Sequence, residues 1–177
     1  KANFNVKKIN QIEKVVKHDV IAFTTNLAEY IGKDSRFIHL GLTSSDVLDT
    51  AFSLQIKESG NLILDEVNEF VKILTKLSRK YIETPIMGRS HGIHAEVTTF
   101  GLVVANWLDE AKRAKNRLIN SIKICSVGQF SGAVGTYSNI QPKIELKACK
   151  LLGLKPVDIS RQIITRDVYA DFFVSLA

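Results

Sequence analysis

The chain has 177 residues, of which 45% are hydrophobic, 24% are charged and 8% are aromatic. These values are those of an ordinary globular protein, so disordered, collagen-like and low-complexity classes are excluded. The formal net charge of +6 indicates either a solvated basic surface or an anionic partner, such as a nucleic acid or a phosphorylated metabolite.

The first helix is predicted from Asn5 to Tyr30. Only ten Gly and three Pro residues occur in the chain, and this scarcity of helix breakers favours long helices. Gly32 lies just past the predicted end, where glycine commonly terminates a helix. The predicted buried face follows from apolar residues spaced by three and four, namely Ile9, Ile12, Val16, Val20 and Phe23.

The second helix is predicted from Thr43 to about Lys80. Thr43 and Asp46 form a capping-box pattern, with a hydroxyl at the cap and a carboxylate three residues later. A helix of this length spans about 55 Å, so it needs long neighbours from this chain or from other subunits. A 3.5-residue apolar period, typical of helix bundles, is formed by Ile63, Val67, Phe70, Leu74 and Leu77.

The third helix is predicted from near Glu96 to about Val127. Residues 128–136 are predicted to be a flexible connection, because their glycine spacing is not that of a dinucleotide-binding loop. A short helix follows from about Gln141 to Leu152, and a last helix begins near Arg166. No strand is predicted, so the expected fold class is all-α, built as a bundle of long helices. The apolar stripe of the third helix consists of Val104, Leu108, Ala111, Ala114, Leu118, Ile122 and Cys125.

Two cysteines, Cys125 and Cys149, match no metal or redox spacing and indicate a reducing compartment. The apolar stretches are too short to span a membrane. The chain begins at Lys1 without a methionine and stops at Ala177 within an apolar pattern. We therefore expect a piece of a longer cytoplasmic protein.

The histidines are the strongest candidates for chemistry. His91 and His94 are three residues apart, but the zinc and di-iron helix motifs are absent, so a metal site is not favoured. A glycine-flanked loop exposes the His91 imidazole, which suits proton transfer near neutral pH, although surface or capping histidines are common. Thr43 and Ser44 stand at a helix start that favours anions, or that is simply well capped.

Five segments in this order resemble the adenylosuccinate lyase family of the fumarase/aspartase superfamily. They are KHDVIAF (17–23), HLGLTSSDVLDTA (39–51), GRSHGIHAE with TTFG (88–101), SGAVGTY (131–137) and RQIITRDVYAD (161–171). The resemblance covers nearly the whole chain. It implies a central bundle of very long helices that assembles as a homotetramer. On this resemblance, residues 1–43 end an N-terminal helical domain, and residues 44–177 begin the long-helix bundle.

The resemblance implies β-elimination of fumarate from adenylosuccinate, which leaves AMP, and from a succinylated aminoimidazole carboxamide ribotide in purine biosynthesis. No metal or organic cofactor is implied. His91 matches the general acid, and His18 supports this acid or binds the phosphate. The implied substrate contacts are Lys17, His18, Asp19, His39, Thr43, Ser44, Ser90 and Gln162.

The chain departs from the family pattern at several positions. Ser90 stands where Thr is frequent, and Val97 stands where Pro is frequent. Arg161 stands where a small hydroxyl residue is usual, and Tyr169 stands where His is frequent. The family's general base, a serine on a mobile loop, matches nothing in the chain, so the segment alone is expected to be inactive.

The expected partners are a succinylated purine nucleotide and further subunits that share active sites, and neither nucleic acid nor membrane. Two alternatives remain open at this stage. One is another fumarate-releasing lyase, similar to argininosuccinate lyase. The other is a non-catalytic basic helical module that assembles or binds nucleic acid.

Overall fold

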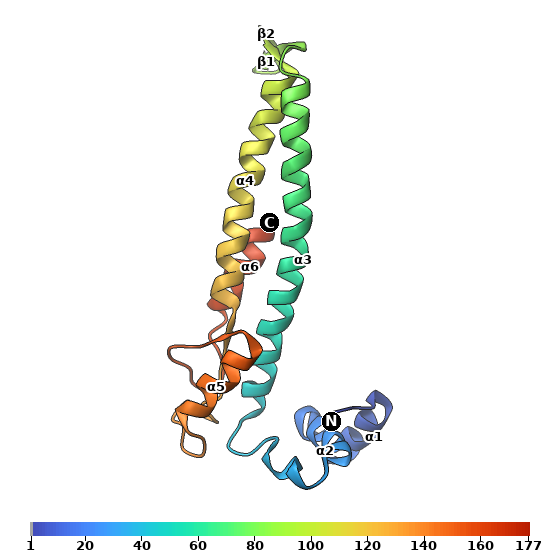
Figure 1. The fold of residues 1–177 in the computed structure, drawn as a ribbon, viewed down its shortest axis with the longest axis vertical. Coiled ribbons are helices and arrows are strands. Elements are labelled where there is room, and N and C mark those ends of the chain that lie inside the picture. The colour runs from blue at the N-terminus through green and yellow to red at the C-terminus, as the bar shows by residue number, and fades with distance from the viewer. Residues whose placement is uncertain (1) are drawn as a thin grey trace. The chain divides into compact units, whose positions relative to one another are not determined.

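The computed structural model describes residues 2–177, and this part of the chain is mainly α-helical (Figure 1). The all-α fold class predicted from the sequence is confirmed, with two small sheets in addition. The α-helices are α1 (Val6–Val16), α2 (Asp19–Ile31), α3 (Ser44–Lys80), α4 (Phe100–Cys125), α5 (Pro142–Leu152) and α6 (Asp167–Leu176). The short elements are the 3-10 helix η1 (Gly32–Phe37), the antiparallel pair β1 (Pro85–Ser90) and β2 (Ile93–Thr99), and the parallel pair β3 (Val127–Gly128) and β4 (Lys155–Pro156).

The chain divides into two compact units, each built from two stretches of sequence. Unit 1 combines the chain up to residue 54 with residues 126–165, and unit 2 combines residues 55–125 with residues 166–177. The boundary predicted between residues 43 and 44 concerns the domains of a longer protein, and it stays a prediction.

The first predicted helix is in fact two helices, so the prediction of one helix from Asn5 to Tyr30 is wrong at residues 17 and 18. Lys17 adopts a left-handed conformation (φ 55°), and its N–H donates to the Glu13 carbonyl and ends α1. His18 is extended and caps α2. The apolar spacing conceals this break, because Val16 and Val20 keep the helical interval of four across it.

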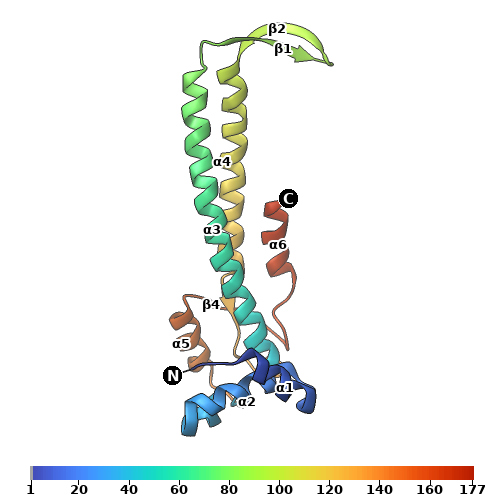
Figure 2. The same cartoon turned by 90° about the vertical axis from the view of Figure 1, so that its right-hand side faces the viewer.

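Unit 2 contains most of α3 together with α4 and α6, and α6 lies beside α4 (Figures 1 and 2). The bounds predicted for α3 are confirmed. Phe70, a member of its predicted apolar stripe, is instead 52% exposed, and Val71 packs inward. The core between α3 and α4 consists of Leu74, Val104 and Ala111, with Val71, Leu77, Phe100 and Leu108 packed against them.

Two glycines allow the helices of unit 2 to approach closely. A Cβ on Gly60 of α3 would lie 2.7 Å from Ile122 Cγ1 of α4 and 3.0 Å from Phe172 Cε2 of α6. A Cβ on Gly101 would lie 2.6 Å from the Ser78 carbonyl oxygen. Gly60 thus allows close packing against side chains of α4 and α6, whereas Gly101 allows close packing against backbone atoms of Ser78 and Ile82.

Residues 85–99 form a β-hairpin, which corrects two predictions: that the chain has no strand and that a helix begins near Glu96. The β-branched residues before Phe100 favour extended backbone, so α4 begins only at Phe100. His91 and Gly92, with φ values of 51° and 78°, form a two-residue turn between Ser90 and Ile93, which pair with each other. Among the residues described, β1 pairs with β2 alone.

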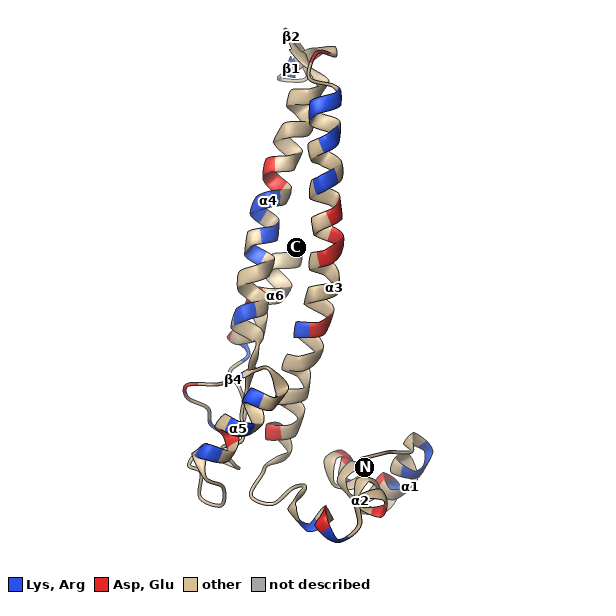
Figure 3. Cartoon of the chain, viewed as in Figure 1, with Lys and Arg blue, Asp and Glu red and all other residues tan. Residues whose placement is uncertain are grey.

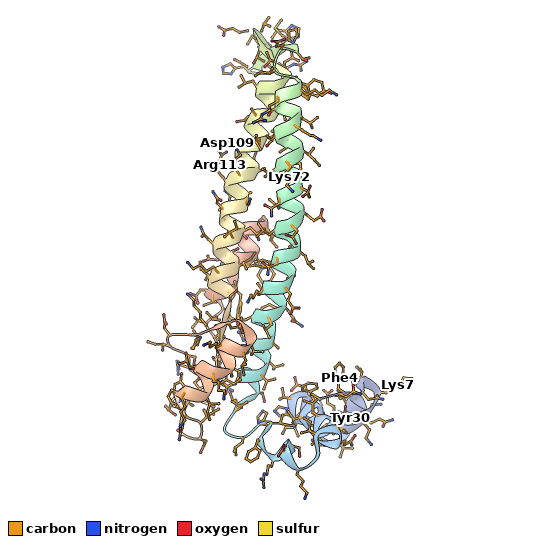
Figure 4. The ribbon with its side chains drawn as sticks, viewed as in Figure 1. Phe4, Lys7, Tyr30, Lys72, Asp109 and Arg113 are labelled. Atoms are coloured by element: carbon orange, nitrogen blue, oxygen red, sulfur yellow. The ribbon has the colours of Figure 1, made fainter. Side chains whose placement is uncertain are left out.

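Charged side chains recur along α4 and the C-terminal half of α3 (Figure 3). On α4, Asp109 and Arg113 are one turn apart and form an exposed ion pair (Figure 4). On α3, Lys72 Nζ lies 2.5 Å from Glu69 Oε1. Both are local helix-surface pairs, which contribute little to stability. No helix in residues 2–177 combines the length and hydropathy needed to cross a membrane.

Candidate functional site

His18 connects the predicted substrate segment 17–19 to the start of α3. Its Nε2 lies 3.3 Å from Ser44 Oγ, and its Nδ1 lies 3.2 Å from Asp19 Oδ1. As the N-cap of α2, the same ring accepts a long hydrogen bond from Ile21 N–H (3.5 Å). The imidazole therefore lies between two helix starts, and the side chains of Lys17 and Asp19 are exposed beside it.

Asp46 closes the predicted capping box from the carboxylate side, because the Thr43 N–H donates to its Oδ2 (3.0 Å). The Asp46 side chain is completely buried. It also accepts hydrogen bonds from the amides of Ser131 (3.3 Å) and Gly132 (3.0 Å). The start of α3 is thus joined to the glycine-rich loop.

The glycine-rich segment 128–136 is irregular, as predicted, but many of its backbone groups are hydrogen-bonded. Phe130 N–H donates to Glu145 Oε1 (2.9 Å), and Tyr137 N–H donates to the Ser131 carbonyl (3.0 Å). Gln129 N–H donates to Thr50 Oγ1 of α3 (3.1 Å). These bonds tie the loop to α3 and α5, and the flexibility expected for it stays a prediction.

The segment that carries Gln162 is held by the same part of unit 1. Ile164 N–H donates to Asp49 Oδ2 (2.8 Å), and Gln129 Nε2 donates to the Gln162 carbonyl (2.9 Å). Ser160 Oγ lies 2.7 Å from Ser131 Oγ. Gln129 is completely buried, and its Oε1 has no hydrogen-bond partner among the described residues.

A pocket of about 640 Å³ lies between the glycine-rich loop and this segment. Gln162, a predicted substrate contact, lines it, and so does Arg161, which departs from the family pattern. Half of the described lining residues are apolar, and Arg161 is the charged residue among them. The lining of the pocket consists of Ala133, Val134, Ile159, Ser160, Arg161, Gln162, Ile163 and Thr165.

The remaining predicted residues lie in two other places. Ser90, His91 and His94 are exposed on the β1–β2 hairpin of unit 2, with His91 in the turn and His94 in β2. His39 lies in a turn of unit 1, and its Nε2 is buried without a hydrogen-bond partner in residues 2–177. The structure thus brings His18 into contact with Ser44, and it bonds the Gln162 segment to Asp49 of α3, all within unit 1.

Sequence reasoning missed the buried polar face at the start of α3. Asp46, Asp49, Thr50 and Ser53 are all buried. They follow the helical spacing of three, four and seven that usually marks an apolar face. The spacing of these polar residues was the available signal that one face of the helix is buried. In the structure, this face accepts hydrogen bonds from backbone N–H groups.

Glu145 was missed as well. It is 3% exposed, and the Tyr137 hydroxyl donates to its Oε2 (2.5 Å). Burial and this hydrogen bond raise the pKa of Tyr137 to about 12. Burial also raises the pKa of Cys149 to about 11. In residues 2–177 no group of three or more His, Cys, Asp or Glu side chains is arranged to hold a metal ion.

Comparison with known proteins gives consistent matches. The model of a lyase family matches residues 1–177. Adenylosuccinate lyase of Synechocystis sp. is 49% identical over 177 residues, which is 100% of this chain and 41% of the relative. Adenylosuccinate lyase of Thermotoga maritima is 47% identical over 176 residues, which is 99% of this chain and 41% of the relative.

A solved structure has a similar fold. The fumarate lyase from Mesorhizobium sp. BNC1 superposes with a TM-score of 0.89 and 28% identity, over 98% of this chain and 42% of that chain. The chain therefore spans about two fifths of the length of the proteins it matches.

Proposed function

Because the chain belongs to the lyase family whose model matches its whole length, we propose that it is part of a full-length adenylosuccinate lyase. The reaction is β-elimination of fumarate from adenylosuccinate, which leaves AMP, and from a succinylated aminoimidazole carboxamide ribotide in purine biosynthesis. The observation that carries the proposal is that two predicted substrate segments contact the same end of α3: His18 contacts Ser44, and the Gln162 segment is bonded to Asp49 through Ile164. The high identity to adenylosuccinate lyases supports the same substrate.

In the elimination, a proton leaves the carbon beside a carboxylate, the C–N bond breaks, and the departing nitrogen takes up a proton. We assign this last step to His91, because imidazole exchanges protons near neutral pH and the hairpin turn exposes it. Ser90 contacts the substrate beside it. The proton acceptor is a serine outside this chain.

The substrate contacts of unit 1 have separate tasks. The hydroxyls of Thr43 and Ser44, at the positive end of the α3 dipole, bind a substrate carboxylate. Lys17 neutralises substrate charge, and Gln162 hydrogen-bonds to the substrate in its pocket. His18 and Asp19 orient the Ser44 hydroxyl, and His39 lies four residues before Thr43, beside the proposed site.

We also propose a cytoplasmic homotetramer whose active sites are completed between subunits. Thr43 and Ser44 begin α3, whereas His91 follows its C-terminal end, so a helix of about 55 Å separates them along the chain. Cys125 and Cys149 are free and buried, which supports a reducing compartment. The exposed apolar side chains of α3 and α4 are suited to subunit contacts, and they include Leu62, Phe70, Leu102 and Trp107.

The test is fumarate release by the full-length protein. We expect His91→Gln to lower kcat by at least about 100-fold with a smaller change in KM, because the proton is needed only as the C–N bond breaks. His94→Gln is the matched control, since His94 is exposed on the same hairpin, and its effect should be milder.

More than half of the wild-type kcat in the His91 variant would show that another group is the acid. Release of fumarate from argininosuccinate, without turnover of adenylosuccinate, would identify the related lyase instead.

A further inference from the structure

We infer that Asp46 is a positioning residue that sets the spacing between the α3 cap and the Gln162 pocket. The inference rests on the proposed function, because it concerns how that substrate is held. Asp46 itself is completely buried, so it reaches no ligand directly and acts through the backbone that it binds.

The contacts of Asp46 join two distant stretches of the chain. Its Oδ2 accepts hydrogen bonds from Thr43 N–H and from Gly132 N–H, each at 3.0 Å. Its Oδ1 accepts one from Ser131 N–H at 3.3 Å. A carboxylate that accepts several amide donors in a buried site forms strong, charge-assisted bonds, so this junction has little freedom.

On one side, the junction holds the anion-binding end of the proposed site. Thr43 N–H belongs to the residue whose hydroxyl faces the substrate in our assignment, and Ser44 follows directly. Ser44 Oγ is itself 3.3 Å from His18 Nε2. A shift of the Thr43 backbone therefore moves the hydroxyl cap as a whole.

On the other side, the junction holds a wall of the pocket. Ser131 and Gly132 lead directly into Ala133 and Val134, which line the pocket with Gln162. Ser131 Oγ also lies 2.7 Å from Ser160 Oγ on the opposite lining segment. The Asp46 carboxylate is thus in hydrogen-bond contact with the backbone of both subsites.

A ligand with two recognition groups gains affinity only when both subsites stand at the right distance. Binding of one group then presents the other at high effective concentration. If Asp46 sets this distance, its loss should weaken the joined ligand much more than either fragment alone.

The decisive variant is Asp46→Asn in the full-length protein. Asparagine keeps one acceptor oxygen, but its N–H₂ group cannot accept, so the junction loses either the Ser131 bond or both the Thr43 and the Gly132 bonds. We expect the KM for adenylosuccinate to rise at least about 10-fold. The inhibition constants of fumarate and of AMP, measured separately, should stay within about 3-fold of the wild-type values.

Glu145→Gln is the matched control. Glu145 is a second buried carboxylate that holds the glycine-rich loop, through Phe130 N–H, but it has no contact with Thr43. Its variant should weaken substrate and fragments by similar factors. If Asp46→Asn does not fold, Asp46→Glu keeps the charge and displaces the junction by one methylene, and it should show the same pattern with a smaller amplitude.

Equal weakening of substrate and fragments by Asp46→Asn would overturn the inference, as would a lower melting temperature with unchanged KM. Wild-type protein that releases no fumarate would refute the proposed function instead. In that case hydrogen exchange tests the junction itself. Asp46→Asn should increase exchange either at Ser131 or at Thr43 and Gly132 together, and unchanged exchange at all three amides would show that Asp46 does not hold them.

Discussion

Substitution of Gly101 by alanine should disturb the base of the hairpin that carries His91. Gly101 is buried in the first turn of α4, and its N–H donates to the Tyr81 carbonyl at 2.8 Å. An alanine Cβ would lie 2.6 Å from the Ser78 oxygen and 2.6 Å from Ile82 Cα. Both atoms belong to the backbone, so no change of rotamer relieves the clash.

The magnitude follows from two opposed contributions. Alanine favours helix over glycine by about 1 kcal/mol. Overpacking costs about 1–3 kcal/mol, and the upper end applies because the backbone itself must move. The free energy of unfolding should therefore fall by about 2 kcal/mol, which lowers the melting temperature by about 4–8 °C at this domain size.

Gly60→Ala is the control for this prediction. Its Cβ would meet the Ile122 side chain at 2.7 Å and the Phe172 ring at 3.0 Å, and both can rotate away. Its expected loss of stability is below about 1 kcal/mol. The assay is thermal and urea unfolding of the full-length variants, combined with kcat, which should fall further in Gly101→Ala. A Gly101 variant as stable as wild type, or more stable than the Gly60 variant, would refute this account of the close approach.

Three further predictions concern the proposed activity and the hydrogen-bonded loop. Residues 1–177 alone should release no fumarate at an enzymatic rate, because a positioned base contributes about 100- to 10,000-fold; normal turnover by this fragment would contradict the division of labour. His91→Gln and a variant lacking the base serine, each nearly inactive, should regain about a quarter of wild-type activity when their subunits exchange, since each site then draws acid and base from different chains. No recovery after exchange, confirmed by native mass spectrometry, would place both groups on one chain. Tyr137 has a folded-state pKa of about 12, above that of an unfolded tyrosine near about 10, so its contribution to stability is complete below pH 10 and is lost as the pH rises to about 12. Urea unfolding of Tyr137→Phe should therefore depend less on pH in this range than wild type, and equal slopes would show that Tyr137 plays no part.

The long helices were predictable because local signals agree with their packing. The capping box of Thr43 and Asp46 and the apolar period marked α3, and Gly153 marked the end of α5. The break at Lys17 carries no glycine or proline, so nothing local reveals it. The β-hairpin escaped prediction because its strands are largely exposed and paired only with each other within residues 2–177.

The sequence motifs proposed the members of the candidate site, but they did not predict how it is held together. His18, Ser44 and Gln162 stood out as residues of matching segments. Asp46 and Asp49 could be assigned to a helix start, but their partners Gly132 and Ile164 lie 86 and 115 residues away. Such partners follow from the tertiary fold, so sequence spacing alone does not identify them.

The left-handed turn at His91 sets stability against the role that we propose for this residue. A non-glycine residue at φ 51° is strained by about 1 kcal/mol or more, and glycine or asparagine would fit this position with less strain. Substitution of His91 by glycine or asparagine would therefore stabilise the fold, and the proposed need for an imidazole opposes it. Duplicated copies released from selection for catalysis should lose this histidine early and become more stable when they do.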